Sequence, residues 1–126
     1  MFDHLDQIDS SDEAALIAGI AYLERAKSVA AARQARLTVL LDSARRCAES
    51  ARGVPTKKQC RGLATEVALA RRESPVRGGQ HLGFAKALVG EMPHTLAALE
   101  SGVLSEWRAT ILVRESACLD VEPAPA

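Results

Sequence analysis

The stretch from Asp12 to Arg52 contains no proline and only one glycine, Gly19. Proline and glycine are the residues that most often interrupt helices, so the whole stretch can form one helix. Ser11 or Asp12 can cap its first N–H groups, and Glu13 adds a favourable charge in the first turn. A helix of this length would span about 60 Å, so we expect it to bend or to pack lengthwise against other helices.

Within this helix, apolar residues recur at alternating steps of four and three, with two polar interruptions at Lys27 and Gln34. The full set of positions is Leu16, Ile20, Leu23, Lys27, Ala30, Gln34, Leu37, Leu41, Ala44, Ala48 and Ala51. This spacing is typical of a coiled-coil seam.

Two interpretations of the seam remain open. In the first it forms a homodimer, with Lys27 and Gln34 setting the register and the main apolar contacts made by Leu16, Ile20, Leu23, Leu37 and Leu41. In the second an intramolecular helical hairpin uses the same seam. We favour the hairpin, because the alanines make the seam thin and the later helices need a surface on which to pack.

The rest of the chain predicts four shorter helices. Gly53 and Pro55 end the long helix, and Thr56 can cap a second one over about 57–73. Ser74 and Pro75 then begin a third helix that reaches about residue 92. A short fourth helix follows over 94–102, and a fifth covers 106–119 after a cap at residue 105. Residues expected on the buried side of the fifth helix are Trp107, Ile111, Ala117 and Cys118, or Leu112 and Leu119.

Composition supports an all-α fold. Apolar residues make up 48% of the chain but aromatic residues only 3%, which is the usage of a helical protein rather than of a sandwich or barrel. We expect a long N-terminal helix packed with several shorter helices in an irregular bundle. Residues 12–119 would form a single helical domain, with a flexible segment at 1–11 and a disordered tail at 120–126.

Charge is unevenly distributed although 16 basic and 16 acidic residues balance. Residues 25–86 carry fourteen bases against four acids, between two acidic ends. Such a segment is typical either of arginine-rich helix faces in contact with solvent or of a surface that binds phosphates. We favour the first interpretation. The candidate nucleic-acid-binding residues are Arg45, Arg46, Lys57, Lys58, Arg61, Arg71, Arg72 and Arg77.

No residue pattern predicts an enzyme, a metal site or a cofactor. None of His4, His81 and His94 has a second ligand three or four residues further along its helix, the pair with which zinc sites usually begin. The three cysteines are widely spaced, which predicts reduced and mostly buried thiols. No apolar run approaches the roughly 20 residues of a membrane span, and the acidic N-terminus lacks a secretory signal. We therefore expect a cytoplasmic protein without a membrane partner.

Residues 64–119 contain three distinctive runs: SP-x-R-G at 74–78, EMPHTLAAL at 91–99 and LSEWRAT at 104–110. On these runs the chain closely resembles the 13E12 repeat family of actinobacteria, over nearly half of its length. The resemblance implies a helical domain of unknown function that often stands ahead of an HNH endonuclease domain. It also implies a truncated copy without the nuclease, because the chain ends seven residues later and no His-Asn-His constellation is present.

These observations lead to three expectations of function. The first is a non-enzymatic helical protein of that family, with weak nucleic-acid binding through the basic segment. The second is a helical protein–protein interaction module that dimerises through the seam. The third is an inert remnant of a truncated gene.

Overall fold

The computed structural model describes residues 11–121, with side chains described for residues 11–117. In this range it contains no strand and has the helices α1 (Glu13–Ala51), η1 (Thr56–Lys58, a 3-10 turn), α2 (Leu63–Arg71), α3 (Pro75–Glu91), α4 (Pro93–Glu100) and α5 (Glu106–Val121). The predicted all-α class, with one long helix packed against several shorter ones, is confirmed. The predicted flexible N-terminus and disordered tail lie almost wholly outside the described residues.

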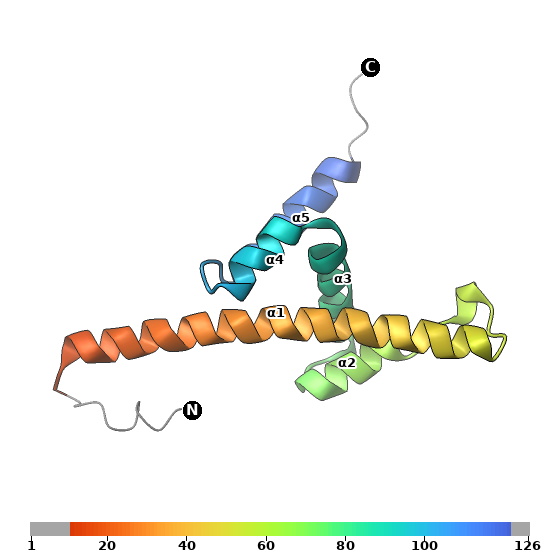
Figure 1. Cartoon of the computed structure of the whole chain (residues 1–126), viewed down its shortest axis with the longest axis horizontal. Coiled ribbons are helices and arrows are strands. Elements are labelled where there is room, and N and C mark those ends of the chain that lie inside the picture. Colours follow the sequence, from red (N-terminus) through yellow and green to blue (C-terminus); the bar gives the residue numbers. More distant parts are fainter. Residues whose placement is uncertain (1–10, 122–126) are drawn as a thin grey trace, which may run out of the picture.

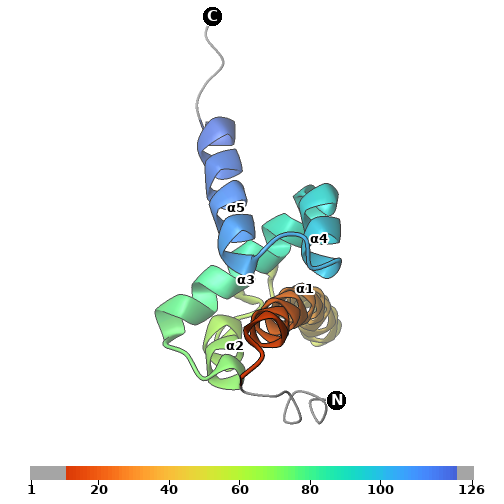
Figure 2. The ribbon, with the colours of Figure 1, turned by 90° about the vertical axis from the view of Figure 1, so that its left-hand side faces the viewer.

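α1 is a single long helix that crosses the whole molecule (Figure 1). The Asp12 side chain caps it by accepting a hydrogen bond from the backbone N–H of Ala15 at 3.1 Å, as the sequence predicts. Gly53 follows its end with a left-handed φ of +80°, a conformation that glycine adopts without strain. Viewed along α1, the other described helices gather on adjoining sides of it (Figure 2). Its N-terminal part extends past them (Figure 1).

α2 begins six residues later than the sequence predicts. The segment after Pro55 forms only the short turn η1, and Cys60 and Gly62 then take left-handed φ values of 60° and 82°. These two residues cannot continue a right-handed helix, so α2 starts at Leu63. The predicted cap at Thr56 is also wrong, because η1 has no side-chain cap.

The caps of the later helices follow the sequence. Ser74 accepts a hydrogen bond from the N–H of Arg77 at 3.3 Å, with Pro75 in the first turn of α3. Ser105 accepts one from the N–H of Arg108 at 3.2 Å. These local signals therefore fix where α3 and α5 begin.

α2 and α3 touch at Gly78, which is buried. A Cβ atom at this position would lie 2.2 Å from the carbonyl oxygen of Ala64 and 2.6 Å from the Cβ of Ala68. The two helices can pack this closely only because residue 78 has no side chain.

The main core lies where α3, α4 and α5 pack onto the middle of α1. The buried residues that the long helix contributes to it are alanines, with Val39 packed partly against them, and the shorter helices contribute the leucines. The buried residues of this core are Ala31, Ala32, Ala35, Ala85, Leu88, Leu96, Leu99 and Ala109. Small side chains on α1 therefore allow the other helices to approach its backbone closely.

The predicted intramolecular use of the seam is wrong. All eleven seam positions from Leu16 to Ala51 are exposed. The buried residues of α1 form a different face, made of Ser28, Ala31, Ala32, Ala35 and Asp42. The physical reason is size, because a face of alanine and serine permits a closer helix approach than a face of leucine and lysine.

The predicted buried side of α5 is also wrong in part. Trp107 is 64% exposed, and Ile111 and Leu112 are exposed too. α5 instead buries Ala109 and packs Val113 partly against the core. Cys118 and Leu119 lie outside the residues whose side chains the structure describes.

Candidate functional site

The largest apolar side chains of α1 face outward. We define the apolar stripe as the leucines and isoleucine of the seam: Leu16, Ile20, Leu23, Leu37 and Leu41. Their exposed fractions run from 39% at Leu23 and Leu41 to 70% at Ile20. A globular helix normally buries such side chains and exposes its small or polar ones. The arrangement on α1 is the reverse, and exposed apolar side chains of this kind are a feature of interaction surfaces.

The stripe divides into two parts around its polar interruption. Leu16, Ile20 and Leu23 lie on the N-terminal part of α1, which we call the arm (residues 13–23). In the side view of Figure 1, no described helix lies alongside this part. Leu37 and Leu41 lie in the middle of α1, beside α2.

Two hollows adjoin the stripe and together make a groove along α1. One, of about 610 Å³, lies between α1 and the start of α5, and its walls include Lys27, Ala30 and Trp107. The other, of about 220 Å³, lies between α1 and α2. Gln34 and Arg71 line both hollows, so the two are neighbours along α1. We call this groove the α1 groove.

The structure disperses the predicted nucleic-acid-binding residues instead of gathering them at one end. Four of them form ion pairs within the described part of the chain: Arg71 with Glu106, and three others. Arg45 binds Glu66 at 2.7 Å, Arg46 binds Asp42 at 3.0 Å, and Arg77 binds Glu73 at 3.4 Å. Because these guanidinium groups already have carboxylate partners, they offer less charge to a phosphate.

The remaining predicted basic residues fall into two groups. Lys57, Lys58 and Arg61 are exposed at the turn between α1 and α2. Arg72 is exposed at the other end of α2, whereas Arg71 beside it is only partly exposed and points into the protein. Only the three residues at the turn therefore form an open basic cluster.

Arg71 joins three helices through a polar network. Its guanidinium donates a hydrogen bond to Nδ1 of His81 at 2.9 Å and lies 3.5 Å from the Glu106 carboxylate. Since Nδ1 accepts, the proton of the neutral imidazole is on Nε2, which donates to Glu73 at 2.7 Å. This hydrogen bond from His81, with the nearby charges of Arg77 and Arg71, lowers the pKa of Glu73. The network thus ties α2, α3 and α5 together.

A second polar cluster holds α1 to α3. Asp42 is buried on α1 and is bound by Arg46 at 3.0 Å and by Lys86 of α3 at 3.3 Å. Burial raises the pKa of Asp42, but the hydrogen bonds and charges of Arg46 and Lys86 outweigh it and leave the pKa below its ordinary value. The Cys60 thiol lies 3.8 Å from the carbonyl oxygen of Asp42, and burial raises the pKa of this thiol.

The cysteines differ from the predicted buried thiols. Cys47 is exposed and Cys60 is partly exposed. Cys118 lies outside the described side chains. A raised thiol pKa at Cys60 disfavours the reactive thiolate, so this residue is not an activated nucleophile.

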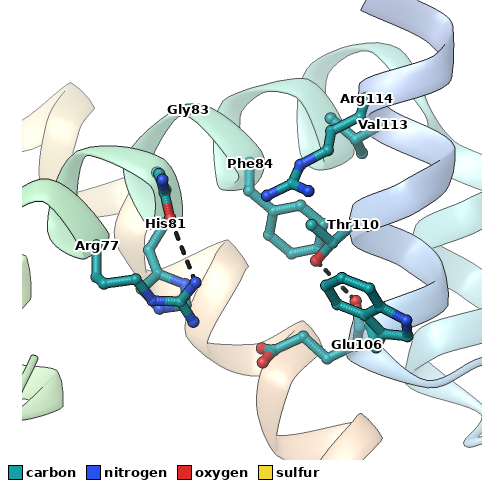
Figure 3. A pocket seen from close by; sticks show the side chains of 10 residues that line it. Arg77, His81, Gly83, Phe84, Glu106, Thr110, Val113 and Arg114 are labelled. Carbon is teal, nitrogen blue, oxygen red and sulfur yellow. Dashed lines mark hydrogen bonds between the residues drawn. The ribbon is translucent and has the colours of Figure 1, made fainter.

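A pocket of about 370 Å³ opens between α3 and α5. Figure 3 shows the Phe84 ring between the two helices, the Arg114 guanidinium pointing toward that ring, and Arg77 beside His81. Apolar and cationic groups together could hold an apolar ligand with an anionic end. Both ring nitrogens of His81 are engaged, and the carboxylate of Glu106, which also lines the pocket, lies 3.5 Å from the Arg71 guanidinium.

Metal ligands and membrane spans can be assessed only for the described part of the chain. There, no three His, Cys, Asp or Glu side chains are grouped to hold a metal ion. No helix between residues 11 and 121 combines the length and the hydropathy that a membrane span needs.

The fold and site define an all-α protein whose longest helix carries an exposed apolar stripe and an adjoining groove. No family model, curated protein or solved structure matches this chain. Its function must therefore be argued from its own residues.

Proposed function

We propose that this chain is a non-enzymatic helical interaction protein that pairs with a second copy of itself through the apolar stripe of α1. The observation that carries the proposal is the inverted arrangement of α1, which buries alanine and serine and exposes leucine and isoleucine. The seam spacing of four and three residues is the one that pairs helices with other helices. The resemblance to the 13E12 repeat family fits this proposal as a helical domain without a nuclease.

The size of the stripe agrees with a dimer that uses all of it. Covering a leucine or isoleucine that is about half exposed contributes on the order of 1 kcal/mol. Two copies bring ten such side chains together, for a total on the order of 10 kcal/mol. Association itself costs about 4–15 kcal/mol. A contact over half of the stripe would contribute about 5 kcal/mol, which is near the lower end of that range.

Replacing Leu37 and Leu41 together by lysine tests the proposal. We expect Leu37→Lys, Leu41→Lys to abolish the dimer at concentrations where the unmodified chain is dimeric, because two ammonium groups would be placed in the contact. Both positions are exposed in the single chain, so helix content should not change. Molar mass by light scattering and helix content by circular dichroism give the two readouts.

A matched control places the same charges elsewhere. Val76 and Val103 are 71% and 85% exposed and lie outside α1. The variant Val76→Lys, Val103→Lys should keep the dimer. If this control dissociates as readily as the stripe variant, the effect is one of added charge and the stripe is not the interface.

A second candidate function, nucleic-acid binding, rests on the cluster of Lys57, Lys58 and Arg61. None of the three has an ion-pair partner among the described residues. If the cluster contacts phosphates, replacing all three residues by alanine should weaken binding to duplex DNA. The slope of log K against the logarithm of the salt concentration should also become less steep, by about 3. A control pair, Arg108→Ala and Arg114→Ala on α5, should leave both unchanged. Equal losses in the two variants would contradict a specific role for the turn.

A further inference from the structure

The arm and the α1 groove have matching patterns. The arm presents Leu16, Ile20 and Leu23, at steps of four and three residues. The α1 groove presents Leu41, Leu37 and Gln34 at the same steps when α1 is followed in the opposite direction. An antiparallel arm from another molecule would therefore place Leu16, Ile20 and Leu23 at the levels of Leu41, Leu37 and Gln34.

We propose that the dimer is antiparallel and reciprocal, with the arm of each copy lying in the α1 groove of the other. This inference rests on the proposed function, and it names the partner surface and the register. Leu16 lies opposite Leu41 of the second copy, Ile20 opposite Leu37, and Leu23 opposite Gln34. The two-fold axis passes between Ser28 and Val29. Such an interface is isologous and closes on itself, so it produces dimers and not filaments.

This register pairs the large apolar side chains with one another. Sliding one helix by a heptad toward the C-terminus of the other would place Ile20 opposite Ala44 and Leu16 opposite Ala48. Those alanines are too small to cover the arm. The match of large residues therefore selects one register among those that the spacing permits.

Charge also favours the antiparallel arrangement. Residues 11–24 carry Asp12, Glu13 and Glu24 and no base. The segment at the same level of the second copy, 33–46, carries four arginines and one acid, Asp42. Arg36, Arg45 and Arg46 already pair with carboxylates of their own chain, so Arg33 is the arginine of this segment that has no ion pair among the described residues. In a parallel, in-register pair, the basic segment of one copy would instead lie beside the basic segment of the other. This arrangement is unfavourable because like charges repel.

The polar interruption of the stripe is accommodated in the same register. Lys27 of one copy reaches the level of Ala30 in the other, in the part of the groove that Glu106 and Trp107 line. A carboxylate and the face of an exposed indole ring both attract an ammonium group. Lys27 thereby contributes to the choice of register instead of only weakening the contact.

Thiol cross-linking between two different single variants tests the register. The natural Cys47, Cys60 and Cys118 are first replaced by serine, and Ile20→Cys and Leu37→Cys are then made on separate chains. In the proposed dimer the two residues numbered 20 are about 25 Å apart along the helices, whereas residue 20 lies opposite residue 37. With a short bifunctional thiol reagent, we expect a cross-linked dimer only when the two variants are mixed.

The possible outcomes separate this inference from the proposed function. The mass of each variant is measured before cross-linking, and the pair Leu16→Cys and Leu41→Cys provides a second test if a cysteine at 20 or 37 prevents association. Dimeric variants could instead cross-link only when each is treated alone, or could fail to cross-link in any mixture. Either result would overturn the antiparallel register and leave the dimer in place. A chain that is monomeric before any cysteine is added would overturn the proposed function itself.

Discussion

The Gly78→Ala variant should lose about 3 kcal/mol of its free energy of unfolding, although alanine is the better helix former. The added methyl group would come 2.2 Å from the Ala64 carbonyl oxygen and 2.6 Å from the Ala68 Cβ. Neither atom belongs to a flexible side chain, so α2 and α3 must move apart, and overpacking of this kind costs about 1–3 kcal/mol or more. Urea denaturation followed by circular dichroism, at a fixed chain concentration, measures the loss.

Gly79 is the matched control for Gly78. It lies on the same helix, and a Cβ there meets no atom within 4 Å. Gly79→Ala should therefore stabilise the protein by about 0.5–1 kcal/mol through helix propensity alone. If both variants were stabilised alike, the close contact of α2 and α3 at Gly78 would be wrong.

The Arg71→Ala variant should lose about 2 kcal/mol of stability, because it leaves two buried or partly buried groups without their partner. His81 Nδ1 would lose its donor and Glu106 its nearest cation. An unsatisfied buried acceptor costs about 1–3 kcal/mol. Thermal unfolding followed by circular dichroism gives the result.

The neighbouring Arg72→Ala variant provides the comparison. Arg72 is exposed, and its left-handed φ of 57° strains alanine about as much as arginine. Its replacement should change stability by no more than about 0.5 kcal/mol. Equal effects at the two positions would show that Arg71 does not link the three helices, and would reopen a binding role for it.

Local signals in the sequence predict most of the helix boundaries. Asp12, Ser74 with Pro75, and Ser105 each cap a helix where the sequence places a cap. The start of α2 was predicted too early, because the left-handed conformation of Cys60 is not a preference of cysteine. That conformation depends on the contacts of Cys60 with the end of α1, such as the hydrogen bond from its N–H to Glu49 at 2.9 Å.

The face of α1 that packs could not be predicted from hydropathy. The leucine seam is more apolar than the face formed by Ser28, Ala31, Ala32 and Ala35. Hydropathy therefore predicts that the seam is the buried face. The small residues prevail because they let α3 and α4 approach the backbone of α1. A stripe of small residues at helical spacing is thus the signal that identifies the buried face.

The polar networks lay beyond prediction for a different reason. Arg71 was assigned to the same basic cluster as Arg72, since the two are neighbours in sequence. One turns inward and the other outward because α2 ends between α3 and α5, and only the tertiary arrangement brings His81 and Glu106 to Arg71. The α1 groove depends in the same way on where α2 and α5 lie.

The molar mass of the unmodified chain as a function of concentration tests the central claim most directly. Sedimentation equilibrium should give a mass approaching twice the chain mass of 13.4 kDa, falling toward 13.4 kDa on dilution. A mass of 13.4 kDa at every concentration up to about 1 mM would limit any association to less than about 4 kcal/mol. That result would contradict the account of the apolar stripe as a dimer interface.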